Sequence, residues 1–375
     1  MYAIDLERVA EQANALRRAL EGAGLPGVVR LALKAQREQA LLRFLRERTP
    51  FVGMDVCSPG EIDWAVRHGW RPHEISYTGT NLSERDLDAI LEVGVHLNVD
   101  LISQIARVGR RAPGLTVGLR VNPRAGAGEA GRTETRYSGK RPTKFGVFRE
   151  RLDEALSVAE EHHLVIDTVH VHAGDGYLSD GLPAFEEVVA RVAEMARFVM
   201  SRGCPIVEVN IGGGLGVPER AGARPLDLEA WAAILARHLG PLGVKVGTEP
   251  GDFLVKESAI LLAEVVSVED REGDLFVGVD AGWNLMGEHF IYGAPLDVVL
   301  CRAADAPPVR LVTIAGNINE GDDLFAENLP LPEVREGDVV AAINVGSYNA
   351  SLASEHCLRP PAAVVCFPDR QPRTP

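Results

Sequence analysis

The feature of the sequence that most constrains the fold is a regular alternation of short apolar segments with segments of helical periodicity. Eight apolar runs rich in β-branched residues occupy 28–33, 51–56, 74–79, 94–99, 115–120, 165–172, 206–211 and 244–249. Between them, in stretches such as 38–47 and 84–94, apolar residues recur every three or four positions. Strands that alternate with helices predict parallel β-α-β units. Eight such units in roughly 250 residues predict a closed (β/α)8 barrel.

The pattern changes near residue 250. Apolar runs at 259–270, 274–282, 308–316 and 338–346 are separated by clusters of Gly, Pro and Asp, with few helical stretches between them. Such a pattern predicts a smaller antiparallel β domain. We therefore expect an α/β protein with a barrel over residues 1–255 and a C-terminal β domain over residues 256–375.

Composition excludes several classes of protein. The net charge of −14 opposes binding to nucleic acid. The five cysteines are scattered without a C-x-x-C pair, so the sequence predicts neither a zinc site nor a disulfide framework. The N-terminal segment is charged throughout, unlike a signal peptide, and no apolar run reaches the roughly 18 residues needed to span a bilayer. We expect a cytoplasmic protein without a metal and without a membrane partner.

Polar side chains gather where the predicted strands end, which in barrels is the end that carries the active site. A lone lysine at such a position is most often a solvated surface residue. Here several predicted strands end in side chains that can carry charge or take part in catalysis, namely Lys34, Asp55, Arg120, His172 and Glu249. Their common position predicts one site in the mouth of the barrel.

Two further segments narrow the chemistry of that site. Gly212, Gly213 and Gly214 follow the seventh strand, and a glycine run followed by a helix-compatible stretch suits a phosphate. His170 and His172 lie two residues apart and so on one strand face. A metal would need a third ligand of suitable spacing, which the sequence lacks, so we expect His172 to stack on a flat ring and His170 to pack in the core.

A lysine, a phosphate cradle, a carboxylate and a flat side chain together indicate pyridoxal 5'-phosphate. The Lys34 amine would bind the aldehyde of the cofactor. The Glu249 carboxylate would keep the pyridine nitrogen protonated, which makes the ring an electron sink.

In these segments and several others, the chain resembles a known family, the fold-type III pyridoxal-phosphate decarboxylases that act on diaminopimelate, ornithine and arginine. The resemblance runs from position 2 to position 358 and onward. It rests on "LALKAQ", "MDVCSPGEI", "LRVNP", "TKFGV", "VHVHAG", "GGGLG", "EPG", "VDAGWN" and "GSYNASLASEHCLRP". It implies that Lys34 binds the cofactor, that Tyr348 lies near the phosphate, and that a head-to-tail homodimer shares its active sites.

The departures from the family are equally specific. The family has a cysteine acid in a β-domain loop, where this chain has Asn319, although Glu320 and Asp323 keep the two carboxylates. An amide has no titratable proton to give. The resemblance therefore makes Asn319 and Glu320 catalytic candidates and Asp323 a substrate-binding one, with Lys34, His172, Glu320 or water as the proton donor.

Acids replace two arginines of the family, one at Asp252 and one at Glu288, and Asp175 replaces a serine. An arginine that grips a distal carboxylate contributes strongly to binding, whereas Glu288 would repel that carboxylate. We therefore expect Glu288 and Tyr348 to contact the substrate, and the substrate to be a non-standard or pathway-specific amino acid rather than meso-diaminopimelate.

Two alternatives remain open at this point. A racemase or epimerase on the same cofactor would need proton donors on both faces, such as Lys34 with Tyr348 or His289. A non-catalytic protein that only binds pyridoxal phosphate would not need the carboxylates of Glu320 and Asp323. The sequence favours an amino-acid decarboxylase over both.

Overall fold

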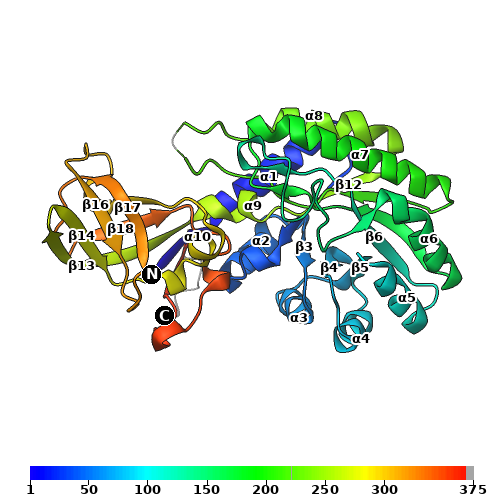
Figure 1. The fold of residues 1–375 in the computed structure, drawn as a ribbon. Helices are drawn as coiled ribbons and strands as arrows, with labels where there is room; N and C mark the ends of the chain where they lie inside the picture. Colours follow the sequence, from blue (N-terminus) through cyan, green and yellow to red (C-terminus); the bar gives the residue numbers. More distant parts are fainter. Residues whose placement is uncertain (221, 369–375) are drawn as a thin grey trace.

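A computed structural model describes residues 1–220 and 222–368 and shows two lobes side by side, with the β-rich lobe at the left of Figure 1 and the larger lobe at the right. All eight predicted apolar runs contain a strand of the larger lobe. The strands are β2 (Gly27–Ala32), β3 (Val52–Val56), β4 (Ile75–Thr78), β5 (His96–Val99), β6 (Thr116–Asn122), β9 (Val165–His170), β11 (Glu208–Asn210) and β12 (Lys245–Thr248).

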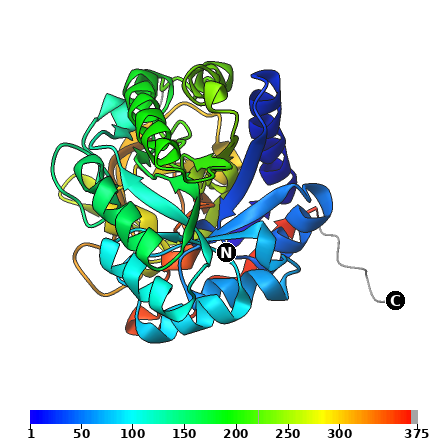
Figure 2. The same ribbon diagram turned by 90° about the vertical axis from the view of Figure 1, so that its right-hand side faces the viewer.

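These strands pair in parallel in the order β5-β4-β3-β2-β12-β11-β9-β6, and pairing of β5 with β6 closes the ring. Helices surround the ring, as the end-on view in Figure 2 shows. They are α1 (Leu6–Gly22), α2 (Gln39–Arg48), α3 (Pro59–Arg67), α4 (Glu84–Val93), α5 (Ile102–Arg111), α6 (Leu152–Glu161), α7 (Leu182–Ser201) and α8 (Leu228–Leu239). The predicted (β/α)8 barrel is confirmed.

Local sequence explains why such helices form where they do, as α4 illustrates. Ser83 accepts a hydrogen bond from the Asp86 N–H, and the Asp86 side chain accepts one from the Ser83 N–H, which forms a capping box. Gly94 ends the helix at a φ of 74°, a left-handed conformation that glycine adopts without strain. Between the caps, Leu87 and Ile90 turn one apolar face into the core.

The smaller lobe is one sheet in the order β15-β18-β13-β14-β16-β17. Its strands are β13 (Ala259–Arg271), β14 (Asp274–Val279), β15 (Asp297–Leu300), β16 (Arg310–Ala315), β17 (Leu324–Leu331) and β18 (Val339–Ile343). The prediction of an antiparallel β domain is confirmed in the main, although β14 and β16 run parallel.

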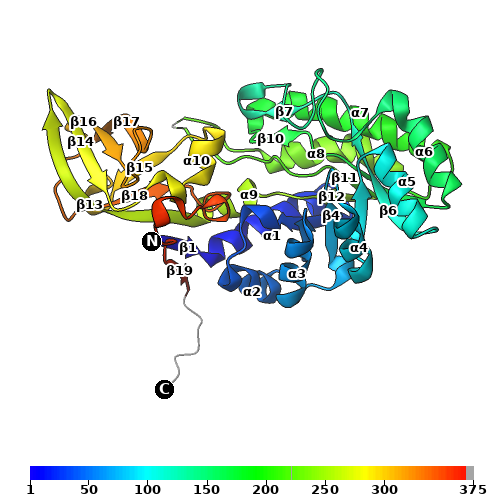
Figure 3. The ribbon, with the colours of Figure 1, turned by 60° about the horizontal axis from the view of Figure 1, so that its bottom comes forward.

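The N-terminal strand β1 (Tyr2–Asp5) differs from expectation, because it joins the smaller lobe. It pairs antiparallel with β13 and parallel with β19 (Val364–Phe367), and Figure 3 shows the three strands together. The prediction that residues 1–255 belong wholly to the barrel is therefore wrong for β1. Strand pairing over a sequence separation of some 260 residues leaves no local signal. The boundary near residue 255 stays a prediction.

The smaller lobe contacts the barrel at the carboxyl ends of its strands. The Tyr348 N–H donates to the Ala35 carbonyl at 2.8 Å, and Gln36 Nε2 donates to the Gly346 carbonyl at 3.0 Å. Both barrel residues follow β2 directly. The barrel mouth is thus covered on one side by the segment that follows β18.

Candidate active site

Lys34 and Asp55 lie beside each other at the barrel mouth. Lys34 is in a single 3₁₀ turn, Leu33–Ala35, directly after β2, and the register pairs Ala32 with Asp55 on β3. The lysine side chain is open to solvent in the mouth, although protein groups surround it. Burial lowers the pKa of Lys34, but Asp55, Cys57 and Tyr137 together outweigh this effect, and the pKa lies above its ordinary value. The amine is therefore held charged beside a carboxylate.

Asp55 is itself an unusual group. Burial and the nearby Glu249 carboxylate raise the pKa of Asp55 well above its ordinary range, against the opposing charge of Lys34. Its Oδ1 is buried without a hydrogen-bond partner among the described residues. An unpaired buried oxygen is costly and points to a missing ligand group at this position.

Glu249 follows β12 and is held by donors on both oxygens. His170 Nε2 donates to Oε2 at 3.0 Å, and Asn210 Nδ2 donates to Oε1 at 2.6 Å. Burial opposes the charge, but His170 and the nearby Arg30 hold the pKa of Glu249 below its ordinary value. Burial lowers the pKa of His170, so we assign it as a neutral donor through Nε2, with a bare Nδ1 that has no partner in the described residues. His170 is buried, as expected, and it also binds Glu249.

The glycine run forms a tight loop rather than the start of a helix. A Cβ on Gly213 would lie 2.4 Å from the Glu249 carbonyl oxygen, and one on Gly214 would lie 2.2 Å from the Gly174 carbonyl carbon. Gly212 and Gly214 have φ angles of 69° and 92°. The next helix, α8, begins only at Leu228, so the predicted helix after the run is absent. A phosphate here would bind to loop N–H groups alone.

His172 lies against this loop. Its Nδ1 accepts a hydrogen bond from the Gly213 N–H at 3.2 Å, and its ring meets the Tyr137 ring edge-on with centroids 4.4 Å apart. Burial and the Lys34 charge hold the pKa of His172 well below its ordinary value. The ring is therefore neutral and fixed in orientation, as stacking on a cofactor requires. Nothing in the motif "VHVHAG" pointed to Tyr137, which comes from a long loop.

Arg120 on β6 is buried and lies over the Phe145 ring at 4.4 Å. No described residue accepts a hydrogen bond from its guanidinium. Asp100, which sequence reasoning missed, is fully buried nearby with both oxygens unpartnered within the described chain. Burial raises the pKa of Asp100 to about 6, although Arg120 opposes the shift. Buried donors and acceptors left unpaired fit a site that takes a polar ligand.

Tyr348 reaches into the mouth from the smaller lobe. A Cβ on Gly251 would lie 2.6 Å from the Tyr348 hydroxyl and 3.0 Å from the Ala35 side chain. The tyrosine adopts a φ of 53°, which a non-glycine residue rarely does. Burial and the Asp252 carboxylate hold the pKa of Tyr348 above its ordinary value. The Tyr348 hydroxyl is therefore neutral, and it lies against Gly251, which also packs against Ala35 of the turn that contains Lys34.

Glu288 binds a buried lysine that sequence reasoning missed, and Asp252 lies within electrostatic range of it. Asp252 opens α9 (Asp252–Val255), and Glu288 lies on α10 (Gly287–Tyr292). Lys256 Nζ donates to Glu288 Oε1 at 2.8 Å and also forms an ion pair with Glu219. Ser347 Oγ donates to Asp252 Oδ1 at 2.6 Å. We call Glu219, Asp252, Lys256 and Glu288 the acidic cluster. The sequence analysis predicted an acidic change at Asp252 and Glu288, and the structure adds Lys256, which neutralises part of that charge.

The 317–323 loop lies away from this site in the same chain. Asn319 and Glu320 are exposed on the smaller lobe, where Glu320 Oε1 contacts His356 Nε2 at 2.7 Å. Asp323 is buried, and its oxygens accept from the Trp283 N–H at 2.7 Å and the Ile318 N–H at 2.6 Å. Both oxygens help to hold the loop, and the substrate-binding role of Asp323 stays a prediction.

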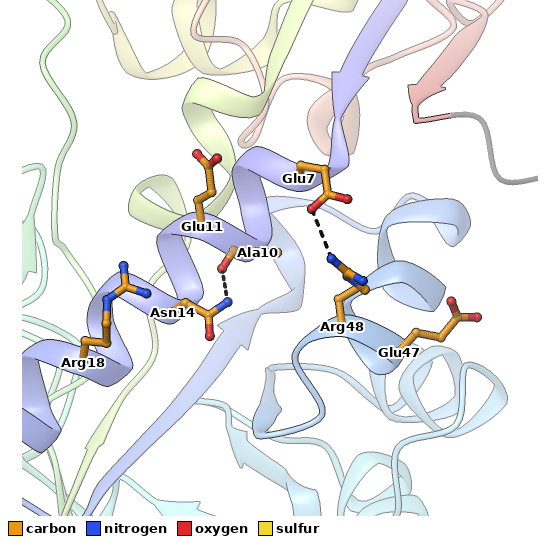
Figure 4. A pocket seen from close by; sticks show the side chains of 7 residues that line it. All are labelled: Glu7, Ala10, Glu11, Asn14, Arg18, Glu47 and Arg48. Carbon is orange, nitrogen blue, oxygen red and sulfur yellow. Dashed lines mark hydrogen bonds and ion pairs between the residues drawn. The ribbon is translucent and has the colours of Figure 1, made fainter.

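Two other features of the molecule lie outside the barrel mouth. A surface hollow of about 350 Å³ lies between α1 and the end of α2 (Figure 4), and its lining contains none of the residues at the strand ends. No helix among the described residues is long and apolar enough to cross a membrane. Neither feature changes the location of the site.

The arrangement at the mouth fits pyridoxal phosphate. Lys34 follows β2 and suits the aldehyde, and Glu249 follows the neighbouring strand β12 and suits the ring nitrogen. The Gly212–Gly214 loop lies beside Glu249 and suits the phosphate. Asp55, Arg120 and His172 line the space between. The individual roles remain our assignments.

Comparisons with known proteins agree with this fit. Residues 6–256 match the model of the pyridoxal-dependent decarboxylase pyridoxal-binding domain. Diaminopimelate decarboxylase of Methanothermobacter thermautotrophicus is 34% identical over 97% of this chain and 86% of the relative. The enzyme of that name from Escherichia coli K12 is 33% identical over 96% and 88%. The crystal structure of Helicobacter pylori diaminopimelate decarboxylase complexed with L-lysine superposes with a TM-score of 0.89, at 26% identity, over 99% of this chain and 92% of the other.

These relatives are carboxy-lyases, so the comparisons favour the decarboxylase reading over the racemase and the non-catalytic one. The relatives are named for diaminopimelate, so the expectation that the substrate is not meso-diaminopimelate is not borne out. The match covers nearly the whole chain in sequence and in fold. This chain therefore belongs to the fold-type III pyridoxal-phosphate-dependent amino-acid decarboxylases.

Proposed function

We propose that this chain removes the α-carboxylate of an amino acid that carries a second ammonium group at the far end of its side chain. The observation that carries the proposal is the acidic cluster, which lies directly behind the lysine turn. Gly251, next to Asp252, packs against Tyr348 and Ala35, and Ala35 is the neighbour of Lys34. A substrate attached at Lys34 would extend its side chain toward these carboxylates.

The residues at the barrel mouth have separate tasks in this reaction. When bound, pyridoxal phosphate supplies an electron sink for the pair left by the departing carboxylate. Lys34 would hold the aldehyde carbon, Glu249 would keep the ring nitrogen protonated, and the N–H group of Gly214 would contact the phosphate, since the Gly212 and Gly213 N–H groups donate to Asn210 and His172. His172 would fix the ring plane, which orients the breaking bond.

The charge of the acidic cluster would set the preference for substrate. Asp252, Glu219 and Glu288 face one ammonium, that of Lys256, so the cluster carries an excess of acid. Burial and Asp252 raise the pKa of Glu288 to about 8, which shows how poorly a further negative charge is accommodated. A distal ammonium would relieve this excess, and a distal carboxylate would increase it.

Meso-diaminopimelate is the second candidate, because it carries a distal ammonium and because the two curated relatives above bear its name. Its distal carboxylate would need a cation. Lys256 is the cation within the acidic cluster, and its ammonium is already bound to Glu288 and Glu219. The acidic cluster therefore favours a substrate without that carboxylate.

The test is release of CO₂ from L-lysine, L-ornithine and meso-diaminopimelate at equal concentrations by the holoenzyme. We expect kcat/KM to be at least about tenfold higher for a diamino acid without a distal carboxylate, since one unfavourable charge contact costs on the order of 1–2 kcal/mol. A preference for meso-diaminopimelate would refute the substrate assignment. Inversion of the α-carbon without CO₂ release would refute decarboxylation itself.

We also propose that the active enzyme is a homodimer in which the 317–323 loop serves the partner's barrel. Asn319 and Glu320 are exposed on the smaller lobe, where Glu320 contacts His356, so a partner subunit can reach both side chains. Mixing the inactive variants Lys34→Ala and Glu320→Gln should restore part of the activity, because one hybrid site would contain both native residues. No restored activity in a mixture shown to exchange subunits would refute a shared site.

A further inference from the structure

The cofactor site needs its two ends held at a fixed separation, because pyridoxal phosphate is a rigid ring between its nitrogen and its phosphate arm. The two ends belong to different strands. The Gly212–Gly214 loop follows β11, and Glu249 follows β12. Something must couple the loop to the carboxylate.

Asn210, the last residue of β11, contacts both. Its Nδ2 donates to Glu249 Oε1 at 2.6 Å, and its Oδ1 accepts from the Gly212 N–H at 2.9 Å. The side chain is 1% exposed. Only an amide offers a donor and an acceptor from one planar group of this size. A serine would not reach both, and an aspartate would lack the donor.

The barrel interior fixes the orientation of this amide. Glu208 and Asn210 lie two residues apart and so point to the same face of β11. Arg30 Nη1 and Nη2 bind the two oxygens of Glu208 at 2.6 and 3.0 Å. On β12, a Cβ at Gly247 would lie 2.3 Å from Glu208 Oε1 and 3.1 Å from Asn210 Cγ. The missing side chain at Gly247 therefore makes room for this layer, and the layer supports Asn210.

Backbone contacts reinforce the same link. The Glu249 N–H donates to the Gly212 carbonyl at 2.8 Å, and Thr248 Oγ1 donates to it at 3.0 Å. The loop and the strand that carries Glu249 are thus joined through the main chain and the Thr248 side chain, and the Asn210 side chain links the loop to the carboxylate itself. Asn210 is the side chain that binds both the loop and the Glu249 carboxylate, and its loss would leave His170 as the remaining described side-chain donor to Glu249 while the main chain stays in place.

We propose that Asn210 is a positioning residue that sets the separation between the phosphate loop and Glu249. It thereby determines both the affinity for pyridoxal phosphate and the proton that Glu249 shares with the ring nitrogen. Asn210 does not itself need to touch the cofactor.

Two variants separate the two contacts. Asn210→Ala removes both of them. Asn210→Asp keeps the shape and the acceptor for Gly212 but replaces the donor with a second carboxylate against Glu249. Two carboxylates in contact cannot both ionise easily, so the pair binds a proton to higher pH.

The matched control is Asn98→Ala. Asn98 is an equally buried amide in the same barrel, and its Nδ2 donates to Ser76 Oγ and Thr78 Oγ1, both at 2.9 Å. It contacts neither Glu249 nor the glycine loop. Its loss reports the general cost of removing an amide from the barrel interior.

The experiment measures the dissociation constant of pyridoxal phosphate by fluorescence titration of the apoenzyme, and the absorbance of the bound cofactor from pH 6 to 9. We expect Asn210→Ala to weaken binding about tenfold or more, as loss of hydrogen bonds to a buried charged group does. We expect Asn210→Asp to move the absorbance transition to a different pH. Asn98→Ala should change neither.

A second comparison tests the coupling. In the Glu249→Gln background, Asn210→Ala should weaken binding much less than it does in the native chain, because the partner charge is gone. Equal losses in the two backgrounds, or an equal loss in Asn98→Ala, would overturn the proposal. Native affinity in Asn210→Ala with an unchanged absorbance profile would overturn it as well.

Discussion

The acidic cluster makes the stability of this protein depend on pH in a direction opposite to that of most carboxylate pairs. Glu288 is 6% exposed, and burial with Asp252 raises its pKa from 4.5 to about 8, despite the ion pair with Lys256. Between these two pH values the folded chain holds a proton that the unfolded chain has released. Stability therefore falls as pH rises through this range. Below pH 4.5 both states are protonated and the group contributes no further change.

Glu288→Gln should remove this dependence. One pKa unit corresponds to about 1.4 kcal/mol, so the upper bound for Glu288 at high pH is about 5 kcal/mol. The lost ion pair with Lys256 offsets part of this gain, since the lysine keeps Glu219. We expect the variant to be more stable than the native chain at pH 8.5 by about 1–3 kcal/mol, and to show little difference near pH 5.5.

The assay is urea unfolding of the holoenzyme at four pH values from 5.5 to 8.5 and at one protein concentration. Glu333→Gln is the control, because Glu333 is exposed in the same lobe and its carboxylate pairs with the exposed Arg335. We expect the control to follow the native profile. An unchanged slope in Glu288→Gln, or a loss of stability that grows with pH, would show that Glu288 is ionised and stabilising in the fold, and the charge argument for the substrate would fail with it.

The remaining predictions concern the barrel mouth and the loop of the smaller lobe. Borohydride reduction of the holoenzyme should attach the cofactor to Lys34, and Lys34→Ala should lose that label; a label of equal yield on another lysine would exclude Lys34. His172→Ala should weaken cofactor affinity by about tenfold, whereas His170→Ala, which removes the donor to Glu249, should chiefly shift the pH profile of turnover. Reversed effects of the two variants would refute both the stacking role of His172 and the positioning role of His170. Asn319→Cys should raise the stereochemical purity of deuterium placement at the α-carbon in D₂O, because it restores an acid near the carbon. Unchanged deuterium placement in both Asn319→Cys and Asn319→Ala would place the loop away from the reaction.

Sequence reasoning reached the barrel and most of the cofactor site because both rest on local patterns. Each strand of the barrel shows its own apolar run, and each of the five predicted strand-end residues lies at or next to the end of a run. Lys34, Asp55, Arg120 and Glu249 could be placed at one end of the barrel without any knowledge of their contacts, since parallel strands end at the same edge. The smaller lobe was recognised in the same way, from the change of pattern near residue 250.

What only the tertiary structure decided is how distant residues pair. Glu288 was an isolated acid in the sequence, and the fold provides Lys256 as its partner across 32 residues. The sequence predicted Asp323 as a substrate-binding residue, and in the fold its carboxylate accepts hydrogen bonds from two backbone N–H groups. The strand β1 precedes the barrel in sequence but pairs with β13. Asn210 and His170 were each adjacent to a motif, and only the register of β9, β11 and β12 brings them to Glu249. Periodicity and turn chemistry are properties of neighbouring residues, whereas the charge and hydrogen bonding of a buried group depend on which strands close around it.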